Sequence, residues 1–95
     1  SVVEGAWTGK FLQRDCTFEF RNEGGAWSGK YMRSDGKSWL PVNELVVSGR
    51  SVSFSIESTP KVSFSLSIGA ENQNMAGTTT IDGVATVPFS AARKP

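Results

Sequence analysis

Two segments in the middle of the chain, 51–57 and 61–69, alternate between apolar and polar positions. The apolar positions are Val52, Phe54, Ile56, Val62, Phe64, Leu66 and Ile68, and serine fills most of the positions between them. Side chains in a strand point alternately to opposite faces, so each segment has one dry face and one wet face. This pattern is typical of antiparallel sheets with one solvated side, because parallel strands read as unbroken apolar runs and need crossover helices.

Turn-forming residues divide the chain at short, even intervals. Clusters containing Gly, Pro, Asn, Asp or Ser, which tolerate or preset turn dihedrals, lie at 14–15, 22–25, 35–36, 48–50, 58–60, 70–74 and 82–83. They predict eight strands, at 5–12, 16–21, 26–33, 44–48, 51–57, 61–69, 75–81 and 84–92. No window has a sustained helical period, and only short pieces such as 41–44 suit a turn of helix.

The connections are all short enough for hairpins, which favours an antiparallel up-and-down meander in a single domain, 1–95. A meander that left its two edges open would be prone to aggregation, and closure removes both edges. We therefore predict an all-β, eight-stranded antiparallel barrel, with a two-sheet sandwich as the alternative.

The last hairpin has two possible registers. A two-residue turn at Asp82-Gly83 would put Ile81 opposite Val84, and would send Val87 and Phe89 to the other face from Ile81. A three-residue loop puts Ile81, Val87 and Phe89 together on the dry face, and we favour this register.

A seven-residue motif occurs twice. Gly-Ala-Trp-Thr-Gly-Lys-Phe at 5–11 recurs as Gly-Ala-Trp-Ser-Gly-Lys-Tyr at 25–31. In a strand the Trp, the second Gly and the last aromatic residue share one face. The residues predicted to point inward, toward Phe18 and Phe20, are Trp7, Gly9, Phe11, Trp27, Gly29 and Tyr31. Glycine inside a strand usually marks a bend or a close approach, and here it leaves room for an indole.

The composition lacks several residue types on which catalysis commonly depends. The chain has no histidine, the commonest general base and metal ligand. Its single cysteine, Cys16, forms no internal disulfide or cysteine zinc cluster, and nothing local lowers the pKa of its thiol. The net charge of +1 gives no broad electrostatic case for nucleic acid or anionic membrane, and no apolar stretch is long enough to span a membrane. We predict a non-enzyme with no metal and no cofactor.

The order of several short motifs resembles a known family. The motifs are the two Gly-x-Trp-x-Gly copies, Val46-Val47-Ser48-Gly49-Arg50-Ser51-Val52-Ser53-Phe54, Phe64-Ser65-Leu66, Ala76-Gly77-Thr78-Thr79 and Val87-Pro88-Phe89. Together they resemble the small lipocalin-like β-barrel domain that occurs alone or N-terminal to bacterial α/β-hydrolases. The chain departs from that family at Thr79, where the family has a third Trp, and in a loop before the last strand that is one residue longer.

The resemblance implies a lipocalin-like barrel with an accessory role and no catalytic residues of its own. It also implies a secreted or periplasmic location. The hydrolase part is absent from this chain, which has neither a Gly-x-Ser-x-Gly elbow nor a histidine for a triad.

The candidate sites are aromatic rather than acidic. The candidate barrel lining is Trp7, Phe18, Phe20, Trp27, Tyr31, Phe54, Phe64 and Thr79. Trp39, after the Asp35-Gly36 turn, is expected to cap the core or to anchor a partner. Glu19 is expected to point outward, and the acids form no inward pair of the kind that a glycosidase needs. The serine rows 51/53/55 and 63/65/67 are expected to form a solvated outer face, with glycan binding as the weaker interpretation.

Two functions fit this pattern. In one, the barrel binds a small apolar or amphipathic ligand between its aromatic side chains, with the space of the missing third Trp left free. In the other, the interior is packed and the domain acts through its outer surface on a protein partner or as a homo-oligomer. We favour the second because the inner face supplies enough apolar positions to fill a small barrel.

Overall fold

The computed structural model describes residues 2–11, 14–32 and 38–94 and contains one antiparallel sheet. Its strands are β1 (Gly5–Phe11), β2 (Arg14–Glu23), β3 (Ala26–Met32), β4 (Trp39–Pro41), β5 (Asn43–Ser48), β6 (Ser51–Ile56), β7 (Val62–Ile68), β8 (Asn74–Ile81) and β9 (Ala85–Arg93). The strand order is β4-β3-β2-β1-β9-β8-β7-β6-β5, and every neighbouring pair is antiparallel. The meander prediction is confirmed, and a two-sheet sandwich does not form.

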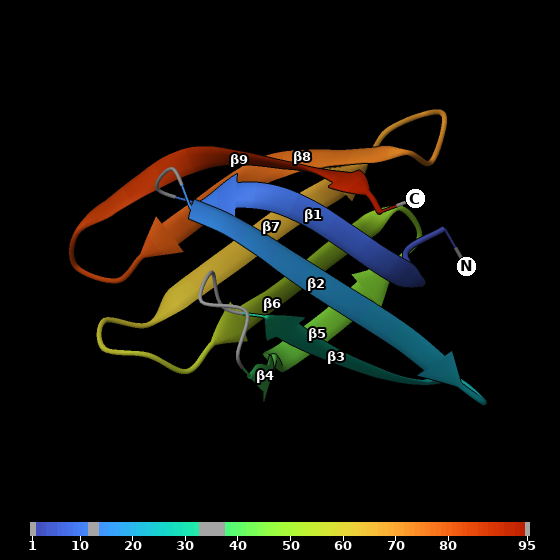
Figure 1. Cartoon of the computed structure of the whole chain (residues 1–95), viewed down its shortest axis with the longest axis horizontal. Helices are drawn as coiled ribbons and strands as arrows, with labels where there is room; N and C mark the ends of the chain where they lie inside the picture. Colours follow the sequence, from blue (N-terminus) through green and yellow to red (C-terminus); the bar gives the residue numbers. More distant parts are fainter. Residues whose placement is uncertain (1, 12–13, 33–37, 95) are drawn as a thin grey trace.

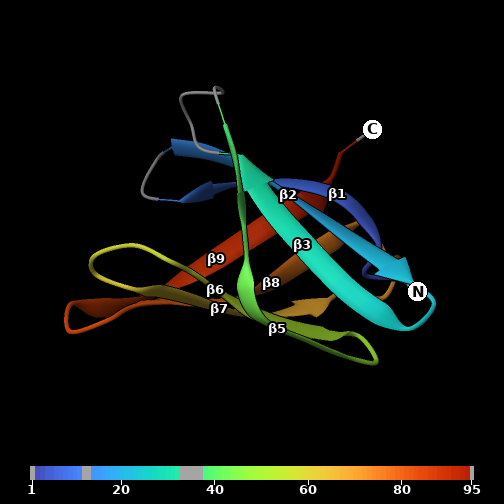
Figure 2. The ribbon, with the colours of Figure 1, turned by 90° about the horizontal axis from the view of Figure 1, so that it is seen from below.

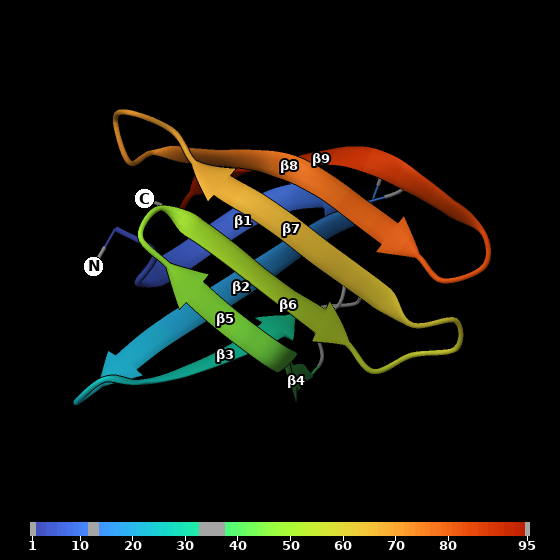
Figure 3. The same cartoon turned by 180° about the vertical axis from the view of Figure 1, so that it is seen from behind.

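The sheet curls into a nearly closed barrel. The first and last strands pair from Trp7↔Arg93 to Gly9↔Ala91, which brings the two ends of the chain to the same end of the molecule (Figure 1). Strands β1 to β3 make one wall, and β5 to β7 make the opposite wall in the view from behind (Figure 3).

The prediction of eight strands was wrong by one. The sequence pattern predicts no strand at 39–41 and allows a helical turn at 41–44, but β4 and β5 run through this region as extended chain. The segment bends at Val42 because β4 pairs with β3, whereas β5 pairs with β6 on the other side of the barrel (Figure 2). Glu44 follows the bend with φ of +55°, and the β5–β6 register shifts between Asn43 and Val46. This left-handed residue and bulge redirect the strand, which no local sequence pattern indicated.

The last hairpin has the three-residue register that we favoured. Ile81 pairs with Ala85, and Val84 N–H donates to Ile81 C=O at 2.9 Å across a β-turn. Gly83, the third residue of this turn, has a positive φ of +73°, which glycine adopts without the steric cost of a side chain. Phe89 consequently points into the core, where it is 4% exposed.

The barrel core is mainly aromatic. The buried hydrophobic residues are Val3, Trp7, Phe18, Phe20, Val42, Val52, Phe54, Ile56, Phe64, Leu66, Ile68, Met75, Phe89 and Ala91. Apart from Val3 and Val42 they come from β1, β2, β6, β7, β8 and β9, so the alternation read from the sequence identifies the inner face of these strands correctly. The side chain of Phe11 and the turn at Asp35-Gly36, both used in the sequence analysis, lie outside the described residues.

Candidate functional site: the barrel interior and its outer face

Phenyl rings from opposite walls meet in the middle of the barrel. The ring centroid of Phe18 on β2 lies 5.2 Å from that of Phe54 on β6 and 5.3 Å from that of Phe64 on β7. Phe89 on β9 lies 6.0 Å from Phe18 and 5.3 Å from Phe64, and all four of these contacts are edge-to-face. These separations are those of packed aromatic pairs. Side chains therefore fill the barrel at this level.

The predicted lining residues all contribute to this interior. Trp7, Phe18, Phe20, Phe54, Phe64 and Thr79 are at most 3% exposed, and Trp27 and Tyr31 are half-buried and pack against the core. The structure thus brings all eight residues to the inner face, as neighbours in a packed cluster.

Thr79 is the exception in chemistry. It is fully buried between Phe64 and Val87 on the neighbouring strands, and its Oγ1 has no hydrogen-bond partner within the described parts of the chain. A buried hydroxyl without a partner costs free energy, so this position is either a packing compromise or a polar contact point for a guest.

The two motif glycines are required by close packing, although not against an indole. A Cβ on Gly9 would lie 2.9 Å from the Phe89 ring and 2.6 Å from the Ser90 carbonyl oxygen. A Cβ on Gly29 would lie 2.8 Å from Val42 and 2.9 Å from Phe20. The prediction of a close approach is confirmed. The neighbours are phenyl rings, an aliphatic side chain and backbone.

One end of the barrel is closed by the chain termini. Trp7 Nε1 donates to Val3 C=O at 3.0 Å, and the Arg93 guanidinium lies 4.2 Å from the Trp7 ring centroid. Arg93 also donates to the carbonyls of Val2 at 2.6 Å, Glu4 at 2.8 Å and Asn72 at 3.0 Å. Trp7 therefore fills the core at this end of the barrel. Arg93 holds the N-terminal segment over the Trp7 side chain. No local sequence pattern indicates this role of Arg93, because its partners lie up to 91 residues away.

Serine rows face each other on the outside of the β6–β7 hairpin. The pairs are Ser51↔Ser67, Ser53↔Ser65 and Ser55↔Ser63. The outer-face prediction is confirmed for the rows, but Ser55 is only 3% exposed.

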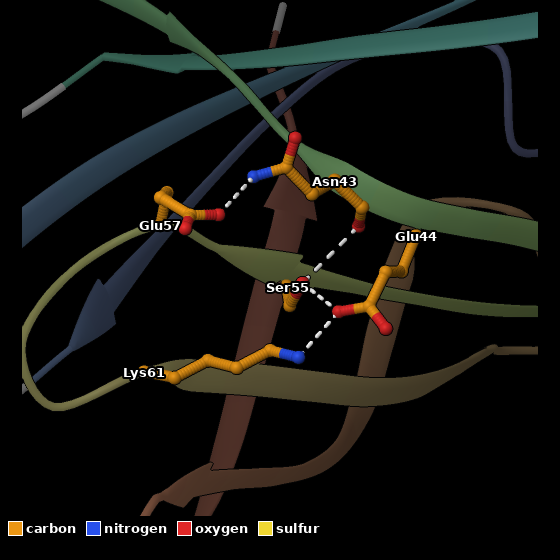
Figure 4. A network of polar contacts seen from close by, with 5 residues as sticks. All are labelled: Asn43, Glu44, Ser55, Glu57 and Lys61. Atoms are coloured by element: carbon orange, nitrogen blue, oxygen red, sulfur yellow. Dashed lines mark hydrogen bonds and ion pairs between the residues drawn. The ribbon is translucent and has the colours of Figure 1, made fainter.

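Ser55 is covered by a polar network on the outer surface, which Figure 4 shows from close by. Its Oγ donates to Glu44 Oε1 at 2.7 Å, and Lys61 Nζ contacts the same oxygen at 2.5 Å. Beside it, Asn43 Nδ2 donates to Glu57 Oε2 at 3.0 Å. The network ties β5, β6 and the segment before β7 together at the bulge.

The charges in this network hold each other in their ionised forms. The Lys61 ammonium, and then the Ser55 hydroxyl, lower the pKa of the Glu44 carboxyl below its ordinary value. The Glu44 carboxylate raises the pKa of Lys61 in turn. A protonated lysine and a carboxylate that already accepts from two donors are both poor proton acceptors. The network is therefore a structural contact between neighbouring segments at the surface. No sequence motif identified it, since the three side chains meet only through the bulge.

Trp39 is 39% exposed and lies on the outer face of β4. Lys30 Nζ lies 4.6 Å from its ring centroid and 3.8 Å from Glu19 Oε1. This arrangement confirms that Glu19 points outward, and it leaves part of the indole available for contact.

Cys16 is half-buried and packs against the core. Burial is the main cause that raises the pKa of its thiol to about 11, and the nearby Asp15 charge adds to the effect. A thiol with this pKa is a weak nucleophile at neutral pH.

A groove of about 530 Å³ runs over β1, β9 and β8 on the outside. Its lining is mostly small side chains, including Thr8, Ala76, Ser90 and Ala92, with Lys10 at one side. Within the described ranges, no three His, Cys, Asp or Glu side chains are grouped to hold a metal ion, and no helix is long and apolar enough to cross a membrane.

Comparison with known proteins adds no further assignment. No family model, curated protein or solved structure matches this chain. The resemblance to the lipocalin-like domain therefore remains a prediction from the motifs, and the class that the geometry defines is an all-β antiparallel meander in a nearly closed barrel.

Proposed function

We propose that this chain is a non-catalytic accessory domain, a filled β-barrel that acts through its outer surface on protein partners. The observation that carries the proposal is the aromatic cluster around Phe18, in which rings from β2, β6, β7 and β9 are in contact across the interior. Small barrels either fill with side chains or hold a ligand, and these contacts favour filling. The resemblance of the motif order to an accessory barrel domain supports the same conclusion.

The test is a binding titration with an internal reporter. In a Trp39→Phe variant the tryptophan fluorescence comes from Trp7 and Trp27 alone, which lie in or against the core. We expect a panel of fatty acids and a naphthalene sulfonate probe to change neither the emission nor the Tm. Saturable quenching at one ligand per chain, with a rise in Tm, would contradict a filled interior.

A second function is supported by Thr79. In this alternative the barrel takes a small apolar or amphipathic ligand whose polar group bonds to Thr79 Oγ1, the buried hydroxyl for which the described residues supply no partner. Half-buried apolar side chains toward the end opposite Arg93, at Val62 near the start of β7 and Val87 near the start of β9, are consistent with an entry there. The same titration separates the two functions, because a ligand held by Thr79 would bind more weakly to a Thr79→Val variant.

A further inference from the structure

The barrel is incomplete along one edge of β5. In the described ladders β5 pairs only with β6, and the other end of the sheet is β4, which pairs only with β3. Val42 N–H donates to Gly29 C=O at 3.0 Å and joins the two ends at one point. Beyond that bond β3 and β5 diverge, as Figures 1 and 3 show from opposite sides. The edge of β5 that faces away from β6 is therefore open toward Ser48.

This open edge is apolar and carries little protection against pairing. Val46 is 59% exposed, and Leu45 and Val47 on either side are half-buried and pack against the core. Natural edge strands are usually blocked by Lys, Pro or a bulge. Between 43 and 48 there is no Lys and no Pro, and the bulge lies at the start of the strand.

Two of the other open edges of the sheet, on β9 and β4, differ in this respect. The ladder between β1 and β9 ends at Gly9↔Ala91, and the unpaired stretch of β9 beyond it contains Pro88. The short strand β4 contains Pro41. Proline lacks the N–H that an incoming strand needs, so these edges are blocked where β5 is not.

The residues of β5 are complementary to themselves in the antiparallel direction. Centred on Val46, two copies of the strand place Val46 opposite Val46, Leu45 opposite Val47, and Glu44 opposite Ser48. Apolar residues face apolar residues, and the single carboxylate faces a hydroxyl, so no like charges meet. The two-residue turn Gly49–Arg50 also fixes the alternation of the β5–β6 pairing, which turns the backbone groups of Val47 toward the open edge.

We propose that two copies of this chain associate through the open edges of β5, antiparallel and with a two-fold axis at Val46. The pairing is isologous, because each copy offers the same edge to the other. It continues the sheet from one barrel into the next. The inference rests on the proposed function in one respect, because both assume that the domain acts through its outer surface.

The first test compares two valines by their effect on the assembly state. Light scattering and sedimentation over roughly 10 µM to 1 mM are expected to give twice 10.2 kDa for the native chain at the upper concentrations. Val46→Lys places two like charges against each other across the axis and removes the apolar pair. We expect it to weaken the dimer at least tenfold and to restore a mass of 10.2 kDa.

Val84→Lys is the matched control. Val84 is 70% exposed and lies in the turn between β8 and β9, away from the edge of β5. It should leave the dimer unchanged. Circular dichroism and Tm establish that both variants are folded before their masses are compared.

The second test fixes the register. In a non-hydrogen-bonded antiparallel pair the two Cα atoms lie about 4.5 Å apart, within the range that a disulfide spans. Val46→Cys should therefore give a disulfide-linked dimer in the absence of reductant, whereas Val84→Cys and the native chain, whose own Cys16 is half-buried, should not.

Three outcomes would overturn the proposal. They are a native chain that stays monomeric up to about 1 mM, a dimer that Val46→Lys leaves intact, and a Val46→Cys chain that forms no more cross-link than Val84→Cys. A monomer whose β5 amides become protected from hydrogen exchange only when an extended peptide is added would assign the edge to a foreign strand, and also overturns it. None of these results bears on the filled interior, which the ligand titration tests separately.

Discussion

At the scale of single residues, Thr79 is the position where the core departs most from its aromatic pattern. It leaves a hydroxyl fully buried with no partner among the described residues. The neighbouring rings of Phe18, Phe64 and Phe89 occupy the middle of the barrel instead. The free-energy cost of burying this hydroxyl arises at a single position, so a single substitution can measure it.

Thr79→Val should stabilise the protein. The substitution keeps the shape of the side chain and removes the unsatisfied hydroxyl, so the free energy of unfolding should rise by about 1 kcal/mol and the Tm by roughly 4–8 °C. Thermal and urea unfolding measure both quantities. Thr78→Val, at an exposed position on the same strand, is the control and should change the free energy by less than about 0.5 kcal/mol. A loss of stability at position 79 would mean that the hydroxyl has a partner in solution.

At the scale of elements, the bulge at the start of β5 depends on an ion pair. Glu44 has a positive φ, and its carboxylate accepts from both Ser55 and Lys61. Because folding lowers the pKa of Glu44, this stabilisation is present above the carboxyl pKa of the unfolded chain and is lost as pH falls through the folded value. Folding raises the pKa of Lys61, so its contribution is present below the unfolded ammonium pKa and is lost as pH rises through the folded value.

Glu44→Gln should therefore remove part of the acid dependence of stability. The amide oxygen still accepts from Ser55 but no longer attracts Lys61. Near neutral pH we expect a Tm lower by a few °C than that of the native chain, and at a pH of about 3 we expect the two values to converge. Calorimetry across this range measures the difference. Glu23→Gln, which breaks the exposed pair between Arg21 and Glu23 at 3.9 Å, is the control and should change Tm by no more than about 1 °C. A difference at position 44 that persists undiminished in acid would contradict the ion-pair account.

At the scale of the whole molecule, the barrel is held by contacts between the two ends of the chain. Arg93 spans them, since it donates to the carbonyls of Val2 and Glu4 while its guanidinium lies against Trp7. Gly5 has a φ of +120°, and a Cβ at this position would lie 2.8 Å from Arg93 Nη1. The N-terminal segment is thus shaped to receive the arginine.

Arg93→Lys should destabilise the whole barrel although it keeps the charge. A lysine ammonium lacks the planar fork that reaches several carbonyls at once, so we expect a loss of about 2 kcal/mol in the free energy of unfolding. Hydrogen exchange should show the earliest opening in β1 and the residues before it. Arg21→Lys, on an exposed side chain of β2, is the matched control and should cost less than about 0.5 kcal/mol. Equal losses in the free energy of unfolding at the two positions would contradict this role of Arg93.

Much of this architecture is readable from the sequence. The period-two alternation of Val52, Phe54 and Ile56 identifies an inner face, because every second side chain on a strand points to the same side of the sheet. Turn residues give the meander, and the shared face of Ile81 and Phe89 gives the loop length of the last hairpin. Each of these features is fixed by neighbours a few positions apart, so local pattern suffices.

Tertiary structure decided the features that join distant segments. Residues 39–48 divide into β4 and β5 because each half pairs with a different wall of the barrel. No residue in the sequence indicates the bend at Val42. The burial of Ser55 depends on Glu44 and Lys61 folding over it, and the role of Arg93 depends on carbonyls at the other end of the chain. The open edge of β5 arises in the same way. Alternation assigns a side chain to a face, but only the closed path of the strands determines which backbone edge is left without a partner.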